Sequence, residues 1–157
     1  MYSMRFNVCF VLMLTFGAAC HLGRPPIQGA AFTVGTILAP VAEPGVEDAI
    51  RDALSSALVA QGGTGEGSAQ PINITVLSAN TAPTAVGDTQ QIHTATLRVI
   101  VQSGDRETRL SGQRQYPVVG PNQADAARSE AFKALALMVA ADAVQWMRYA
   151  PMEGNHE

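Results

Sequence analysis

The sequence predicts an α+β protein with a four-stranded, mostly antiparallel sheet and two helices packed on one face of it, in the order β-α-β-β-β-α. Three observations support this fold class. Two segments carry apolar residues at helical spacing, and the segments around them alternate apolar and polar residues. Breaks rich in Gly, Pro and Ser separate these segments.

Residues 1–19 have the features of a secretory signal peptide. Arg5 precedes an apolar run over residues 8–14, and small residues at 17–19 lead directly into Cys20. The run is shorter than the roughly 20 residues that span a membrane. Small residues before a cysteine resemble the lipobox of bacterial lipoproteins, with Gly17 where that family usually has Leu. The resemblance implies that Cys20 becomes the N-terminus and carries acyl chains; a secreted protein with an unpaired cysteine is the alternative.

Removing residues 1–19 from the 157 would leave 138, the size of one domain. We therefore expect a signal peptide at 1–19, a lipidated tether at 20–30, one domain at 31–150 and a polar tail at 151–157. Only 30 of these 138 residues are Val, Ile, Leu or Phe, which predicts a thin core rich in alanine. With 9 basic and 13 acidic residues left, the net charge of −4 argues against a nucleic-acid partner.

The first half of the domain contains a strand, a helix and a second strand. Residues 31–38 form the first strand candidate, which Pro40 and Pro44 follow. Residues 46–60 read as an amphipathic helix that has two acids in its first turn and a Gly62-Gly63 stop. Its apolar stripe consists of Ile50, Leu54, Ala57 and Leu58. Ile72, Ile74 and Val76 then alternate with Asn73, Thr75 and Leu77, the pattern of a half-buried strand.

The second half contains two strands and a long helix. Residues 80–88 read as a turn-rich connection, and residues 92–101 as a strand with Ala95, Leu97, Val99 and Val101 on one face. Ser103-Gly104-Asp105 indicates a hairpin that leads to a polar, exposed strand over about 106–116. Residues 124–149 form a long helix. Its predicted stripe is Phe132, Leu135, Val139, Ala143 and Trp146, widened by Leu137, Met138, Val144 and Met147.

The residue pattern contains no catalytic, metal or cofactor site. His93 is the only histidine in a predicted element, and no G-x-S-x-G nucleophile motif accompanies it. His, Cys and carboxylate residues do not occur at metal-binding spacing. The Gly-rich segment 62–67 lacks the lysine of a phosphate-binding loop and follows a helix rather than a strand. We therefore expect a protein that is not an enzyme and holds no cofactor.

Four arginines form the candidate binding site for an anion. Arg106, Arg109 and Arg114 lie in or near the predicted hairpin, and Arg98 lies on its partner strand. We expect them to gather on one surface of the sheet, where the bidentate guanidinium suits phosphate groups. Ordinary surface charge is the alternative, because Asp105 and Glu107 lie beside them.

The sequence resembles the LPS-assembly lipoprotein family LptE in the order of three features: a lipobox-like Cys20, a strand and the segment 42–54. In this segment, Pro44-Gly45 leads into an amphipathic helix. The order of the later elements and the long Ala-rich last helix are similar as well, so the resemblance covers residues 20–150. It implies a lipoprotein anchored by its acyl chains on the periplasmic face of the outer membrane. It further implies a partner and plug of the LptD β-barrel in LPS transport, with LPS itself as a ligand. The alternative is a periplasmic lipoprotein accessory that activates an envelope enzyme or assists a transporter.

Overall fold

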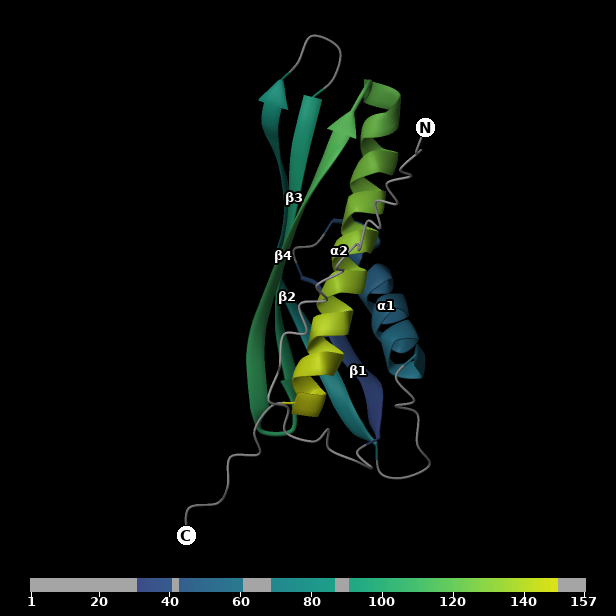
Figure 1. Ribbon diagram of the computed structural model, residues 1–157, viewed down its shortest axis with the longest axis vertical. Helices are drawn as coiled ribbons and strands as arrows, with labels where there is room; N and C mark the ends of the chain where they lie inside the picture. The colour runs from purple at the N-terminus through teal and green to yellow at the C-terminus, as the bar shows by residue number, and fades with distance from the viewer. Residues whose placement is uncertain (1–30, 41–42, 61–68, 87–90, 150–157) are drawn as a thin grey trace, which may run out of the picture.

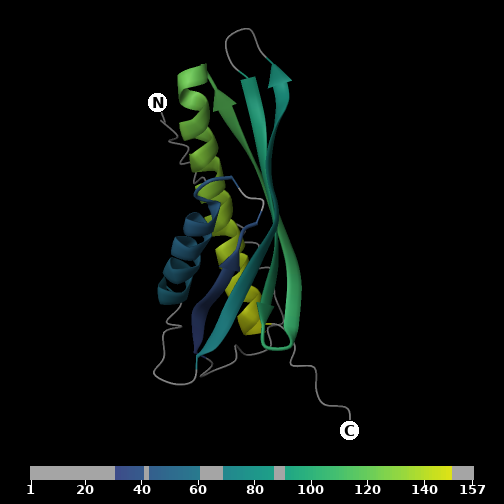
Figure 2. The ribbon, with the colours of Figure 1, turned by 180° about the vertical axis from the view of Figure 1, so that it is seen from behind.

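The computed structural model describes residues 31–40, 43–60, 69–86 and 91–149, and it confirms the predicted fold class. The elements in these ranges are β1 (Phe32–Leu38), α1 (Val46–Ala60), β2 (Gln70–Val86), β3 (Gln91–Ser103), β4 (Arg106–Val118) and α2 (Pro121–Tyr149). The strands form one sheet in the order β1-β2-β3-β4. β1 runs parallel to β2, and the other two pairs are antiparallel. Both helices lie on the same face of the sheet (Figures 1 and 2).

α1 begins and ends where the sequence pattern predicts. Gly45 has a φ of 81°, a left-handed conformation that glycine adopts without strain, and it immediately precedes the first helical residue. The first turn carries Glu47 and Asp48, whose charges favour the positive end of the helix dipole. The predicted stripe packs inward, with Ile50 and Leu54 fully buried. α1 thereby provides the crossover that a parallel strand pair requires.

β2 is longer than predicted, and the prediction of a turn-rich connection over residues 80–88 is wrong for its described part. Residues 80–86 belong to β2 and pair with β3 up to Gln91. The register shifts between Val76 and Ser78 and again between Pro83 and Ala85. β1 pairs only with residues 70–75 of β2, so at Pro83 the strand β2 has a neighbour on one side only. Proline is tolerated there because it lacks a backbone N–H, and no strand on the open side requires one. Pairing with β3 therefore overrides the local turn preference.

A tight hairpin joins β3 to β4, as the sequence indicates. Gly104 has a φ of 59°, and no other described residue except Gly45 has a positive φ. A positive φ at the first central position and not at the second is the pattern of a type II′ turn, which suits the twist of paired strands. Ser103 pairs with Arg106, and the register continues without a shift to Gln91 and Val118. This register determines which β4 side chains point toward the helices and which point to the opposite face of the sheet.

α2 packs across β3 and β4, and its stripe is narrower than predicted. Most predicted stripe residues are buried, but Leu137 and Met138 are 57% and 41% exposed, so their assignment to the core is wrong. Leu137 lies on the flank of α2, whereas Met138 is partly exposed but reaches the sheet at Gly112 with its methyl group. Side chains of α2 lie directly over Gly112, where an added Cβ would overlap Met138 Cε and lie 3.0 Å from Leu135 Cδ2. Within the described ranges, neither helix combines the length and apolarity needed to span a membrane.

The core lies between the helices and the sheet and is lined by small and branched residues. Five of its members are alanines of α2 or β3, which confirms the expectation of an alanine-rich core. Ala95, Leu97, Val99 and Val101 of β3 are fully buried, as the alternation in the sequence predicts. No described buried side-chain nitrogen or oxygen lacks a hydrogen-bond partner.

Candidate functional site

The face of the sheet away from the helices carries polar side chains. Because successive side chains of a strand point to opposite faces, the residues between the buried positions of β3 point outward, as do their partners on β2 and β4. No helix covers this surface in Figures 1 and 2. We call it the open face: Asn73, Thr75, Ser78, Asn80 and Ala82 of β2, Thr94, Thr96, Arg98, Ile100 and Gln102 of β3, and Glu107, Arg109, Ser111, Gln113 and Gln115 of β4.

Two of the four predicted arginines belong to the open face. Arg98 pairs with Ser111 and Arg109 pairs with Ile100, so the two arginines are diagonal neighbours. Diagonal neighbours lie about 7–8 Å apart, and the distance between their Cβ atoms is somewhat shorter. Both side chains are exposed, and none of the ion pairs within the described ranges includes either of them. Two exposed guanidinium groups outside every ion pair of the described residues can bind an anion such as a phosphate group, whereas Glu107, the acidic residue of this face, accepts a hydrogen bond from Gln102.

Arg106 points to the opposite face, toward the end of α2. Its Nη1 and Nη2 donate hydrogen bonds to the carbonyl oxygens of Met147 and Trp146 at 3.5 and 3.3 Å. The guanidinium carbon also lies 4.6 Å from the centre of the Trp146 ring. These are the carbonyls that a helix leaves without intrahelical partners at its C-terminus. Arg106 therefore caps α2 and holds it against the β3–β4 hairpin.

Arg114 also lies outside the open face. It pairs with Ala95, a buried position on the helix-covered face, and its neighbours on that face are the buried Gly112 and Tyr116. Its side chain is nevertheless exposed, because β4 is an edge strand. The expectation that all four arginines gather on one surface is therefore wrong, since the β3–β4 register divides them into two pairs. Their binding of an anion stays a prediction, and Cys20 lies outside the described residues.

The described residues contain no converging set of catalytic groups. His93 pairs with Tyr116, with ring centres 5.7 Å apart, and its Nε2 lies 3.2 Å from Gln91 Oε1. The described ranges hold no group of three or more His, Cys, Asp and Glu side chains that is able to bind a metal. Glu47, which the sequence places at the start of α1, forms an ion pair with Arg51 at 2.9 Å.

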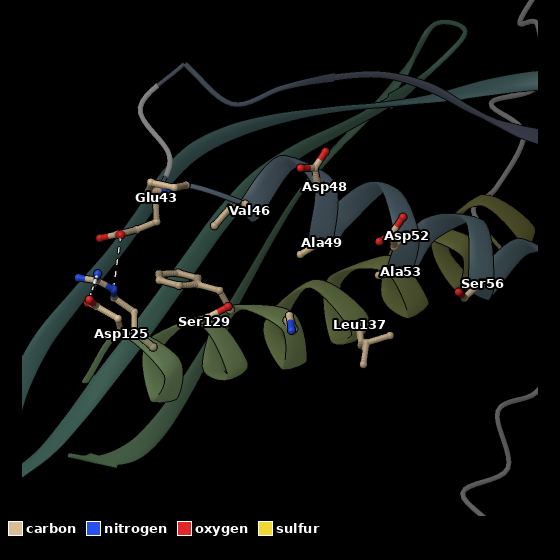
Figure 3. A pocket seen from close by; sticks show the side chains of 15 residues that line it. Glu43, Val46, Asp48, Ala49, Asp52, Ala53, Ser56, Asp125, Ser129 and Leu137 are labelled. Carbon is tan, nitrogen blue, oxygen red and sulfur yellow. Dashed lines mark hydrogen bonds and ion pairs between the residues drawn. The ribbon is translucent and has the colours of Figure 1, made fainter. Parts of the chain in front are cut away.

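Sequence reasoning missed a groove of about 610 Å³ between α1 and α2 (Figure 3). Its walls are the first three turns of α1 and the first half of α2. At one end, Arg128 of α2 forms an ion pair with Glu43 at 3.5 Å, which links the segment before α1 to α2. Arg128 also forms an ion pair at 2.7 Å with Asp125, one turn earlier in α2. The exposed Leu137 lies on the α2 wall. The only sequence signal for the groove is the pair of small residues Ala49 and Ala53 on α1, which the predicted apolar stripe of this helix does not include.

Comparison with known proteins finds solved structures of low similarity and no matching family. No protein-family model matches the chain, and no curated protein matches it. Among solved structures, a minor lipoprotein from Acinetobacter baumannii is 18% identical with a TM-score of 0.48, covering 71% of this chain and 91% of its own. Rare lipoprotein B from Shewanella oneidensis is 10% identical with a TM-score of 0.42, covering 72% and 93%. A Xanthomonas campestris protein of family DUF330 is 14% identical with a TM-score of 0.46, covering 80% and 91%. At these identities and TM-scores, the likenesses do not assign a function to the chain.

Proposed function

We propose that the protein is a lipoprotein of the outer membrane, anchored through Cys20, that acts as partner and plug of an LptD-like β-barrel in LPS transport. The signal-like residues 1–19 and the small residues before Cys20 support the anchor. More than one acyl chain makes such an anchor stable. The resemblance of residues 20–150 to the LptE family supports the partner.

The open face is the observation that carries the proposal. The interior of an outer-membrane barrel is polar, whereas its outer surface is apolar. A plug must therefore present a polar surface to the barrel wall, and the open face does so over β2, β3 and β4 without a helix covering it. The elongated body, with α2 lying along the strands in Figures 1 and 2, is a suitable shape for insertion along a barrel axis.

A substitution in the middle of the open face tests this surface. Thr96 of β3 and Gln113 of β4 pair with each other, and both side chains point out of the open face. Tryptophan at both positions therefore adds bulk to this surface and does not enter the core. We expect the T96W/Q113W double variant to fold normally but to lose co-purification with the barrel from detergent-solubilised envelopes. Val59→Trp, at an exposed position of α1 away from the sheet, serves as the control for added surface bulk.

Depletion of the protein tests the role in LPS transport. We expect the barrel to be misassembled and LPS to disappear from the cell surface. A normal barrel and normal surface LPS after depletion would refute the proposal. Co-purification with a peptidoglycan synthase or an inner-membrane transporter in place of a barrel would favour the accessory function instead.

Arg98 and Arg109 are the residues that we propose contact LPS phosphate groups. Because an exposed charge pair contributes up to about 1 kcal/mol, loss of both guanidinium groups should weaken LPS binding about tenfold. The measurement is LPS binding by the R98A/R109A double variant. Arg51→Ala is the matched control, because Arg51 is exposed on α1 and pairs with Glu47. Equal losses in the two variants would exclude a specific role for the open face.

The lipid anchor has its own test. We expect Cys20→Ala to release the protein from membranes and to remove the mass of the acyl chains. Unchanged membrane association and unchanged mass would show that Cys20 is not lipidated.

A further inference from the structure

We propose that the groove between α1 and α2 is a docking site for an amphipathic helix of a partner protein, with basic residues beside its apolar stripe. The groove lies on the helix side of the molecule, whereas the open face lies on the other side of the sheet. The proposal is therefore independent of LPS binding and of the barrel contact through the open face.

The walls and floor of the groove suit a helical ligand. Ala49 and Ala53 of α1 are small, so they allow the backbone of a ligand to come close, and the buried Phe132 of α2 lines the groove as well. The α1 wall from Val46 to Ser56 extends about 15 Å, since a helix rises about 1.5 Å per residue. Helices that dock in grooves present anchors at i, i+4 and i+7, which fit within this length.

Leu137 supplies an apolar contact that the protein itself does not cover. It is 57% exposed although it lies in the middle of α2, where a polar side chain would be expected on a solvated flank. It lines the groove from the α2 side, opposite the α1 wall (Figure 3). A docked apolar stripe would bury it.

The charges beside the groove favour a cationic ligand. Arg128 is neutralised by two carboxylates, and Lys133 forms an ion pair with Glu130 at 3.1 Å. Asp48 and Asp52 stand on successive turns of α1, exposed and outside every ion pair of the described residues (Figure 3). The groove therefore has uncompensated negative charge on its α1 side. This charge attracts a basic helix and repels an anionic lipid headgroup.

A pair of synthetic helical peptides tests the proposal on the full chain. One 14-residue peptide carries leucines at i, i+4, i+7 and i+11 with lysines on both sides of the stripe, and its counterpart carries glutamates in place of the lysines. We expect the lysine peptide to bind in fluorescence anisotropy and the glutamate peptide to bind at least about fivefold more weakly.

Two pairs of variants locate the binding. The D48N/D52N variant should weaken the lysine peptide about fivefold, whereas D105N/D142N, which removes the same charge from exposed positions elsewhere, should not change its affinity. Leu137→Ala should weaken it about tenfold, while Val59→Ala, at an exposed position outside the groove, leaves it unchanged.

Several results would overturn the proposal. Equal affinities of the lysine and glutamate peptides would show that charge does not select the ligand. Equal losses in D48N/D52N and D105N/D142N would place binding outside the groove. Sedimentation that shows a dimer of the wild-type chain, lost in Leu137→Ala, would assign the groove to a second copy of this protein instead. Because D48N removes an acid from the first turn of α1, a thermal melt must show that each variant is folded.

Discussion

Replacing Arg106 with alanine should loosen the C-terminal end of α2 from the sheet. The substitution removes two hydrogen bonds to α2 carbonyls, at 3.5 and 3.3 Å, and the contact over the Trp146 ring at 4.6 Å. Both hydrogen bonds are longer than the usual 2.9–3.0 Å, so each lies at the low end of its range, about 0.5 kcal/mol. A partly exposed cation–π contact adds about 0.5–1 kcal/mol. The expected loss in the free energy of unfolding is therefore about 1.5–2 kcal/mol.

Urea unfolding followed by Trp146 fluorescence measures this loss directly. The indole is the only tryptophan of the chain, and it lies at the affected junction. For a slope of about 1–3 kcal/mol per molar urea, the midpoint should fall by about 0.5–2 M. Arg106→Lys keeps a cation near the helix C-terminus but lacks the planar fork, so it should recover only part of the stability.

Arg109→Ala is the matched control for Arg106→Ala. Arg109 is exposed on the open face and has no ion pair among the described residues, so its loss should change stability by less than about 0.5 kcal/mol. If Arg106→Ala unfolds at the wild-type midpoint, the cap does not contribute as argued. Equal destabilisation by both variants would show that Arg106 stabilises the protein no more than an exposed arginine of the open face does.

Three further substitutions test the packing. Gly35→Ala should lower the free energy of unfolding by about 1–3 kcal/mol. The added Cβ would displace Asn73 Oδ1, which accepts a 2.8 Å hydrogen bond from the Thr36 N–H. An unchanged urea midpoint would contradict this expectation. Leu54→Ala should cost about 2–5 kcal/mol in the same assay, because the side chain is fully buried; a loss below 1 kcal/mol would mean that α1 is loosely packed. Gly112→Leu should lower the melting temperature measured by circular dichroism, because the new side chain must displace Met138 Cε and Leu135 Cδ2 of α2, and a melting temperature at the wild-type value would refute this close contact.

Local signals were sufficient for the elements that have a strong period and clear ends. α1 begins after Pro44-Gly45 and ends before Gly62-Gly63, so its predicted bounds of 46–60 are those of the structure. The alternation in β3 and the Gly104 hairpin are likewise confirmed, because both depend on residues that are neighbours in the chain. The α+β class follows from the order of these elements.

Long-range pairing decided what local preference could not. The end of β2 contains Asn80 and Pro83, which favour turns, yet this segment is a strand because β3 pairs with it. Leu137 and Met138 fit a helical stripe by spacing, but the packing of α2 against α1 and the sheet leaves them 57% and 41% exposed. The groove beside Leu137 exists only because α1 packs next to α2.

The sequence by itself determined the kinds of element, their order, the alanine-rich core and the presence of arginines near the hairpin. The tertiary structure alone decided which face each arginine occupies. A strand's side chains alternate, so a shift of one residue in the β3–β4 register would exchange the faces of all β4 residues. The two-residue turn sets that register, and it places Arg98 and Arg109 on the open face while Arg106 caps α2.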